Sequence, residues 1–526
     1  MSQPNILLII TDQERAIQHF PPGWERRNLP NMTLLKQNGL SFKNAVCNAC
    51  MCSPSRSTLF TSLYPAQHGV TDTLTYGSRY SSVETELSNA LPTMATMLRA
   101  THNPQFRGKW HISKGGQNSV HPEKTLMAAD IAIFGFGGWT PPDSGEDTKL
   151  ENFGGGYANH DANYIDQAIA FIEGHAQAQR DAAAVGKKPP KPFLLVVSLV
   201  NPHDVLSYPS SYQLGGYDDP SWLDGKIQLP PTVNENLSAN YKPSAQAQLL
   251  KLLAPGLGPL VTPKRQKEYL NFYGNLMKHI DGEIGRLLDL FYEQPADKSG
   301  QRAPKALANE TLIIRTADHG EMGLAHGGLR QKAFNVYEET MRIPMVFSNP
   351  KMFPGGAESE QLISLIDVMP TLASVCGVPV PSGIRGVDMS PVLRDPGLAT
   401  PIQDSTLFTF DDIRAGMMVK ELVNAADRIR CIRQGKWKYA RYFRAQGSYP
   451  NEYELYYLGG IHDPNHVPEG PLEKYLLSQP YEYINLAYPD NPLMANWPPE
   501  IKRQIAKKHD ELALALEQKE QLLLPD

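Results

Sequence analysis

Residues 5–13 of the chain read NILLIITDQ, an apolar run that ends at an acidic residue, Asp12. Such a run is typical of a β-strand that is buried on both faces of a sheet, here over residues 6–11. Two later runs repeat the pattern, residues 193–200 (FLLVVSLV) and residues 311–316 (TLIIRT). Buried strands that alternate with helical segments predict an α/β fold, in which helices sandwich a large, mostly parallel or mixed sheet.

A polar cluster follows each of these three strands. Asp12 ends the first strand, His203 follows the second within Asn-Pro-His-Asp, and Asp318 follows the third within Ala-Asp-His-Gly. In open α/β sheets, ligands bind in the crevice at the carboxyl ends of the strands. We therefore expect these three side chains to meet at one edge of the sheet.

Two further features concern the segments around the sheet. Apolar residues recur at intervals of three or four over residues 269–291, which predicts a long helix that covers the sheet with one apolar stripe. Residues 177–192 and 206–263 are rich in Pro, Gly, Ser and Ala, so we expect insertions or long loops there.

The sequence pattern changes after about residue 400. Residues 437–443 and 453–458 predict paired strands, and residues 500–522 predict an amphipathic helix. We therefore predict a larger α/β domain with the site over residues 1–400. A smaller C-terminal α+β subdomain, with a small antiparallel sheet and a terminal helix, is expected over residues 401–526.

Composition and charge argue against several classes of protein. The net charge is −5 and no long basic run occurs, which disfavours a nucleic-acid partner. The longest apolar runs are far shorter than the roughly 20 residues that span a bilayer, so we expect no membrane partner. The N-terminus, MSQPNILLIITD, lacks a basic region and a cleavage site, so we expect a cytoplasmic protein.

Three cysteines are clustered in the stretch VCNACMCSPSRSTLF, residues 46–60. A zinc knuckle or a redox pair would use Cys47 and Cys50. Structural zinc needs four ligands, however, and the remaining cysteines, Cys376 and Cys431, stand far away in the sequence. We expect Cys47 and Cys50 to be buried, unreactive thiols, and no disulfide framework.

Cys52 differs from its neighbours because Pro54 follows two residues later. Proline is favoured in the first turn of a helix, where its missing N–H costs no hydrogen bond. Cys52 would then lie at a helix N-terminus, where the partial positive charge of the helix stabilises an anion. A thiolate at that place is an activated nucleophile.

The segment Cys52-Ser-Pro-Ser-Arg56 resembles the C-x-P-S-R signature of the type I, formylglycine-dependent sulfatases, a family of the alkaline phosphatase superfamily. Further motifs agree with that family in order along nearly the whole chain. They are Thr11-Asp12-Gln13, Gly108-Lys109-Trp110-His111, Pro202-His203-Asp204, Asp318-His319-Gly320-Glu321, Lys332 ahead of Tyr337-Glu338, Ile366-Asp367-Val368-Met369-Pro370-Thr371 and Glu482-Tyr483-Ile484-Asn485-Leu486-Ala487. The Pro-His-Asp cluster also resembles choline-sulfatase-like members.

The resemblance implies an alkaline-phosphatase-like fold and a sulfuric ester hydrolase that cleaves sulfate monoesters. The nucleophile would be a hydroxyl of the formylglycine gem-diol, which a formylglycine-generating enzyme makes from Cys52. Asp12, Asp318 and His319 would bind one divalent cation, together with the Gln13 carbonyl and the modified Cys52. Oxygen-rich ligation suits calcium best, with magnesium or manganese as alternatives.

The other motif residues would bind sulfate and transfer protons. The resemblance implies that Arg56, one helical turn after Cys52, supports the gem-diol and the metal-ligating carboxylates. Lys109 and Lys332 would bind the sulfate oxygens as compact point charges. His111 would act as the base that releases sulfate and His203 would assist the leaving oxygen, although the sequence allows the two roles to be exchanged.

Three places depart from the family pattern. Gln13 stands where a second aspartate is frequent, residues 60–63 read FTSL where Leu-Thr-Gly-Arg is usual, and the expected loop over residues 101–107 lacks a short Gly-Tyr form.

Two alternative functions stay open at this stage. A phosphonate monoester or phosphodiester hydrolase of the same superfamily shares the fold and the modified cysteine, but the GKWH motif with Lys109 and His111 favours the sulfatase. In a catalytically inactive binding protein we would not expect every catalytic position to be filled. The predicted partners are a small-molecule sulfate ester and the modifying enzyme, and a homo-oligomer is left open.

Overall fold

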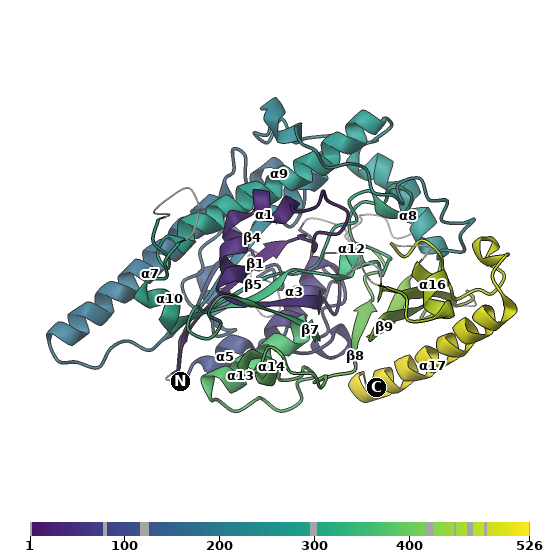
Figure 1. Cartoon of the computed structure of the whole chain (residues 1–526). Helices are drawn as coiled ribbons and strands as arrows, with labels where there is room; N and C mark the ends of the chain where they lie inside the picture. The colour runs from purple at the N-terminus through teal and green to yellow at the C-terminus, as the bar shows by residue number, and fades with distance from the viewer. Residues whose placement is uncertain are drawn as a thin grey trace.

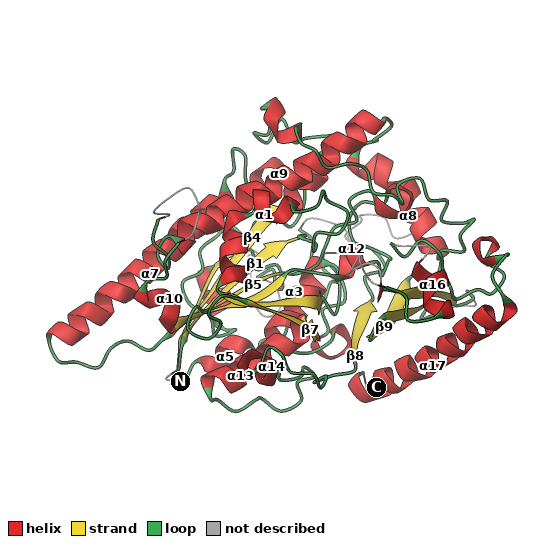
Figure 2. Ribbon diagram, viewed as in Figure 1, coloured by secondary structure: helices red, strands yellow, loops and turns green. Residues whose placement is uncertain are grey.

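Two β-sheets organise the chain (Figures 1 and 2). The computed structural model describes residues 3–76, 81–115, 126–294, 302–415, 424–446, 449–459, 467–477 and 481–524. The larger sheet has seven strands in the order β3-β4-β1-β5-β6-β2-β7, and the smaller has four in the order β11-β10-β9-β8. The predicted α/β architecture with a small antiparallel sheet is confirmed.

The large sheet is mixed, with one strand reversed. Its strands are β1 (Asn5–Asp12), β2 (Gly39–Val46), β3 (Asn103–Gly108), β4 (Phe193–Pro202), β5 (Thr311–Ala317), β6 (Met345–Ser348) and β7 (Ala357–Ser364). β6 is antiparallel to β5 and β2, and every other pair is parallel. β1, β4 and β5 confirm the three predicted strands. The segment over residues 101–107, expected as a loop, instead forms most of β3, because its backbone pairs with β4.

Helices cover both faces of the large sheet, and β1 contributes to both cores. Its side chains alternate, so Leu7 and Ile9 pack in one core and Ile6, Leu8 and Ile10 pack in the other. The first core includes α2 (Pro30–Gln37), α7 (His160–Ala184) and α9 (Pro263–Leu288). The second includes α3 (Cys52–Thr61), α5 (Met94–Leu98) and α13 (Val368–Cys376). Figures 1 and 2 show α7 and α9 on one side of the sheet and α5 and α13 on the other.

The predicted long helix is α9, but two expected loops are partly helical. α7 continues to Ala184, and α8 (Ser244–Leu257) lies within the segment 206–263. Alanine has the highest helix propensity, and the C-terminal end of α7 and the start of α8 contain several alanines. The prediction of loops throughout these two segments was therefore wrong.

The small sheet is antiparallel and lies beside a long C-terminal helix. Its strands are β8 (Ser405–Phe410), β9 (Arg428–Gln434), β10 (Trp437–Phe443) and β11 (Glu452–Tyr457). α17 (Pro499–Leu523) packs on them with one apolar stripe, which includes Ile501, Ile505, Leu512 and Leu516. The paired strands and the terminal helix are as predicted, while the domain division near residue 400 stays a prediction.

The remaining helices are short. They are α1 (Trp24–Asn28), α4 (Pro65–His68), α6 (Ala128–Ala132), α10 (Ala306–Glu310), α11 (Ala325–Gly328), α12 (Glu338–Met341), α14 (Ser390–Arg394) and α16 (Pro471–Leu477), with 3-10 turns η1 (Leu150–Asn152), η2 (His203–Ser207), η3 (Pro220–Leu223), η4 (Leu365–Asp367) and η6 (Pro492–Met494). Within the described residues, no helix combines the length and the hydrophobicity needed to cross a membrane.

Candidate active site

The carboxyl ends of the parallel strands bring the predicted residues to one edge of the large sheet. Asp12 is the last residue of β1, Lys109 follows β3, His203 follows β4 and Asp318 follows β5. Gly108 permits the close approach of β3 to β4, because its φ is 100° and a Cβ atom there would lie 1.9 Å from the Ser198 carbonyl oxygen.

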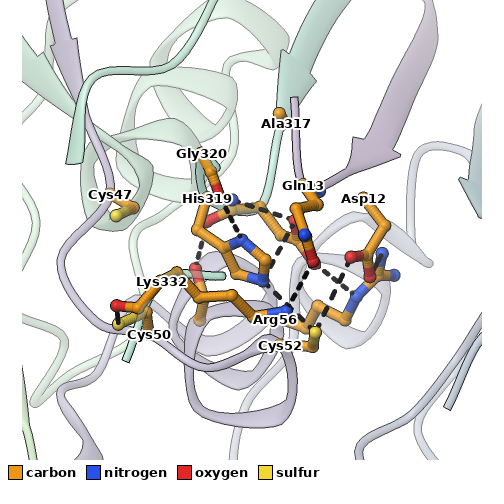
Figure 3. A network of polar contacts seen from close by, with 12 residues as sticks. Asp12, Gln13, Cys47, Cys50, Cys52, Arg56, Ala317, His319, Gly320 and Lys332 are labelled. Atoms are coloured by element: carbon orange, nitrogen blue, oxygen red, sulfur yellow. Dashed lines mark hydrogen bonds and ion pairs between the residues drawn. The ribbon is translucent and has the colours of Figure 1, made fainter. Parts of the chain in front are cut away.

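Cys52 starts helix α3 at the centre of this cluster (Figure 3). Its Sγ lies 3.2 Å from His319 Nε2 and 3.7 Å from Asp12 Oδ1, and its side chain is buried. Burial raises the pKa of the Cys52 thiol, as does Asp12. The charges of Lys332, Lys109 and His319 outweigh both effects and hold that pKa well below its usual value. These charges favour the thiolate form of the unmodified residue.

Arg56 connects the two aspartates of the cluster. Its guanidinium donates to Asp318 Oδ2 at 2.9 Å and to Asp12 Oδ2 at 3.1 Å. It also donates to the Lys109 carbonyl oxygen at 3.0 Å and to Ser198 Oγ at 2.6 Å. Arg56 and both carboxylates are fully buried. The rigid, forked guanidinium therefore fixes the separation of the two carboxylates.

The two predicted lysines come from distant parts of the chain and both lie in the cluster. Lys109 Nζ lies 2.6 Å from Asp12 Oδ2 and also contacts the Gly145 carbonyl oxygen. Lys332 Nζ donates to Gln13 Oε1 at 2.7 Å, and its charge contributes to the low pKa of Cys52. Both side chains are buried, which leaves their charges little screened by water.

The donor atoms around Cys52 fit a divalent cation. Ligand atoms of Asp12, Cys52, Asp318 and His319 all lie within 4.8 Å of one another. Burial raises the pKa of Asp318 to about 6, and the neighbouring Asp12 adds to this effect. A bound cation would favour the charged form of both carboxylates and so relieve their repulsion.

Gln13 lies next to these ligands with its hydrogen-bonding groups already engaged. Its backbone N–H donates to Asp318 Oδ1 at 3.1 Å, and its backbone carbonyl accepts from Tyr273 at 2.8 Å. Its side-chain carbonyl accepts from Lys332, and its amide donates to Glu321. The side-chain oxygen has a second lone pair, so Gln13 remains a candidate neutral ligand.

The two predicted histidines are in different environments. His111 Nε2 lies 2.8 Å from the Leu74 carbonyl oxygen, and its Nδ1 is buried without a hydrogen-bond partner among the described residues. A carbonyl only accepts, so Nε2 carries the proton and Nδ1 is a free acceptor. Burial and the charge of Lys109 lower the pKa of His203 to about 3, against the opposing effect of Asp12, so His203 is neutral near pH 7.

Cys47 and Cys50 are buried, free thiols, as predicted. Cys47 Sγ lies 3.7 Å from the Thr340 carbonyl oxygen, and Cys50 Sγ lies 3.3 Å from the Lys332 carbonyl oxygen. Burial raises the pKa of both thiols above the usual value. All five cysteines are buried and free, so no disulfide framework forms.

Two contributors to the site were missed in the sequence. Ser198, which binds Arg56, is the lone polar residue inside the apolar run of β4, and that exception was its only signal. Asp143 accepts from the backbone N–H groups of Trp110 and His111, at 2.7 Å and 2.9 Å. It lies in a loop without any motif, and no local pattern identifies it.

The predicted effect of Lys332→Met tests whether this lysine binds an anion. We expect kcat/KM to fall by about 100-fold, mainly through a higher KM, because one buried positive charge facing the substrate is lost. Lys36→Met is the control, since Lys36 pairs with Glu25 away from the cluster. Steady-state kinetics of both variants would contradict the role if KM were unchanged in Lys332→Met.

A family model described as Sulfatase matches residues 4–378, well over half of the chain. The chain belongs to the sulfatase family. A second model, described as the C-terminal region of N-sulphoglucosamine sulphohydrolase, matches residues 326–469 of this sulfatase. The family assignment predicted from the C-x-P-S-R segment and its companion motifs is confirmed.

Individual relatives are distant in sequence and similar in fold. Arylsulfatase K of Canis lupus familiaris is 21% identical over 476 residues, covering 86% of this chain and 77% of the relative. A structure solved in complex with its substrate D-glucosamine-2-N,6-O-disulfate has a TM-score of 0.64 at 19% identity, covering 99% of this chain and 98% of its own. A phosphonate monoester hydrolase of Agrobacterium radiobacter has a TM-score of 0.62 at 19% identity, covering 98% and 96%. This sulfatase therefore has the alkaline-phosphatase-like fold, and family membership makes it a sulfuric ester hydrolase.

Proposed function

We propose that this sulfatase hydrolyses a small-molecule sulfate monoester with a formylglycine made from Cys52 and one divalent cation. The observation that carries the proposal is the position of Cys52 Sγ, at the start of α3 and 3.2 Å from His319 Nε2, among ligand atoms that lie within 4.8 Å of one another. The cation would be held by Asp12, Asp318 and His319, with Gln13 beside them. Two carboxylates suit calcium first, and magnesium or manganese next.

Two groups would complete the chemistry. The cation would supply stabilisation of negative charge at the attacking oxygen. Formylglycine would supply a hydrated aldehyde whose hydroxyl attacks sulfur, and a formylglycine-generating enzyme would have to act on Cys52 before the chain reaches its final fold, because Cys52 is buried.

The chain's own cations would bind the sulfate group. Lys109 and Lys332 are buried, their charges both act on Cys52, and they would neutralise the sulfate oxygens. Four of the five N–H groups of Arg56 donate to protein acceptors, so its main role would be to position Asp12 and Asp318.

The protonation of the two histidines supports separate roles. His111 presents a lone pair on Nδ1, because its Nε2 donates to the Leu74 carbonyl oxygen. It would accept a proton when sulfate is released. His203 is neutral and would donate an N–H hydrogen bond to the leaving oxygen.

A hydrolysis screen tests the proposal against its nearest alternative. We expect the metal-loaded protein, made together with a modifying enzyme, to have its highest kcat/KM on one of the aryl, choline or sugar sulfates. Phosphonate monoesters and phosphate diesters form the comparison set, since a phosphonate monoester hydrolase shares the fold. A higher kcat/KM for any of them than for every sulfate would overturn the proposed substrate class.

A further inference from the structure

A second group of metal-ligand side chains lies outside the candidate active site. It consists of His326 in α11, Glu339 in α12 and Glu482 near the end of the chain, whose ligand atoms lie within 4.8 Å of one another. The three side chains are buried, with exposed fractions of 0%, 4% and 4%. None of them belongs to the group around Cys52.

The orientation of the His326 ring is fixed by two contacts. Its Nδ1 lies 2.7 Å from Glu235 Oε2, and its ring stacks on Tyr337 with centroids 3.6 Å apart and an interplanar angle of 6°. A carboxylate only accepts, so Nδ1 carries a proton that points to Glu235. In metal sites, a carboxylate bound to one ring nitrogen in this way directs the other nitrogen to the metal.

The other ring nitrogen of His326 points into the group without a hydrogen bond. Among the described residues, Nε2 is buried and unpartnered, and Glu339 Oε2 is 3.8 Å away, too far for a hydrogen bond. His326 also has φ 50°, an unfavourable conformation for a residue other than glycine, which the surrounding contacts must maintain. A buried lone pair facing a carboxylate is unfavourable unless a cation lies between them.

The two glutamates of this group differ in how closely neighbouring cations approach them. Glu482 Oε1 lies 2.5 Å from Lys438 Nζ, but Lys438 also pairs with Glu338 at 3.1 Å. Within the described chain, Glu339 has His326 as its one ion-pair neighbour. Glu482 Oε2 also accepts from the Glu338 backbone N–H at 2.8 Å, so Glu339 is the carboxylate of the group that a further cation would compensate.

We propose that His326, Glu339 and Glu482 bind a zinc ion that ties the loop after β5 to the C-terminal segment. One imidazole and two carboxylates are ligands that zinc accepts, and zinc binds such sites more tightly than manganese. Zinc–ligand bonds of about 2.0–2.2 Å place ligand atoms roughly 3.4 Å apart. His326 Nε2 and Glu339 Oε2, now 3.8 Å apart, are therefore already close to the separation that a shared zinc ion requires. The tied loop carries Lys332, so the ion would help to hold that lysine beside Cys52.

The test uses the full chain with its first site disabled, because the Cys52 thiolate would itself bind zinc. We expect the double variant Cys52→Ser/Asp318→Asn, stripped with a chelator and titrated with zinc chloride, to bind one zinc per chain and to gain in Tm. Adding Glu339→Gln is expected to weaken zinc binding by at least about 100-fold. Adding Glu454→Gln instead is the matched control, since Glu454 is buried nearby and accepts from Tyr442 at 2.6 Å but is outside the ligand group.

Two outcomes would overturn the proposal. The first is a folded double variant that binds no zinc in calorimetry and elemental analysis. The second is an unchanged zinc affinity after Glu339→Gln. Should that variant fail to fold, X-ray absorption of the zinc-loaded double variant decides the question. Because Asp12 and His319 remain in the double variant, the spectrum is also recorded with His319→Ala added. A shell with one imidazole and oxygen in both variants supports the site. A shell with sulfur, a shell without imidazole, or an imidazole that is lost with His319→Ala refutes it.

Discussion

Cys52→Ala is expected to lower kcat by at least about 10⁴-fold while the chain remains folded. Cys52 is the first residue of α3. Its Sγ lies 3.7 Å from Asp12 Oδ1 and 3.2 Å from His319 Nε2. An alanine methyl group cannot attack sulfur, and the small change in volume leaves the buried partners of Arg56 in place. Steady-state kinetics and thermal unfolding of the purified variant measure the two effects.

Cys47→Ser and Cys50→Ser are the matched controls for this prediction, because both thiols are buried near Cys52 and inert. Peptide mass spectrometry of the wild-type chain, made beside a modifying enzyme, should find formylglycine at residue 52 and thiols at the other four cysteines. Activity retained in Cys52→Ala would remove Cys52 from the nucleophile role, and an unmodified thiol in fully active protein would remove the formylglycine.

Asp318→Asn is expected to abolish binding of the active-site cation and to lower kcat by about 10³-fold. The substitution keeps the shape of the side chain but removes one of the two charges that would hold the cation. It also leaves Arg56 with a single carboxylate partner, Asp12. Elemental analysis gives the number of metal ions per chain, and kinetics at saturating metal separates weak binding from lost chemistry.

Asp281→Asn is the control for loss of a buried carboxylate elsewhere. Asp281 accepts from the backbone N–H groups of Asn31 and Met32 in another part of the fold, so this variant should keep both its metal and its turnover. A full complement of calcium in Asp318→Asn would place the cation among other residues. Zinc that is lost on Glu339→Gln is assigned to the group of His326, Glu339 and Glu482, and it is not counted as the active-site cation.

Much of the fold and of the site could be predicted because their signals are local. β1, β4 and β5 are continuous apolar runs, and a run of that kind forms a buried strand in almost any context. Each is followed by a polar residue, and parallel strands place their carboxyl ends at one edge. Asp12, His203 and Asp318 therefore come together without any knowledge of their contacts.

The remaining strands and helices depended on tertiary partners. β3 has the sequence NPQFRG, which contains a proline, a glycine and three polar residues and has no strand pattern of its own. Its strand conformation follows from pairing with β4, whose residues are about 90 positions later. α8 contains Pro255 and lies in a segment whose composition is typical of a loop, so the sequence did not indicate this helix.

The sequence by itself determined which residues carry the chemistry: the helix start at Cys52, the acids at the strand ends, and the lysines and histidines of the motifs. Only the tertiary structure decided how they act on one another. Arg56 reaches Ser198 and Asp318, the free nitrogen of His111 is set by the Leu74 carbonyl, and Lys332 reaches Gln13 across 319 positions. The reason is physical: strand and helix signals arise from neighbouring residues, whereas hydrogen-bond partners and burial, which set protonation, arise from segments that meet only after folding.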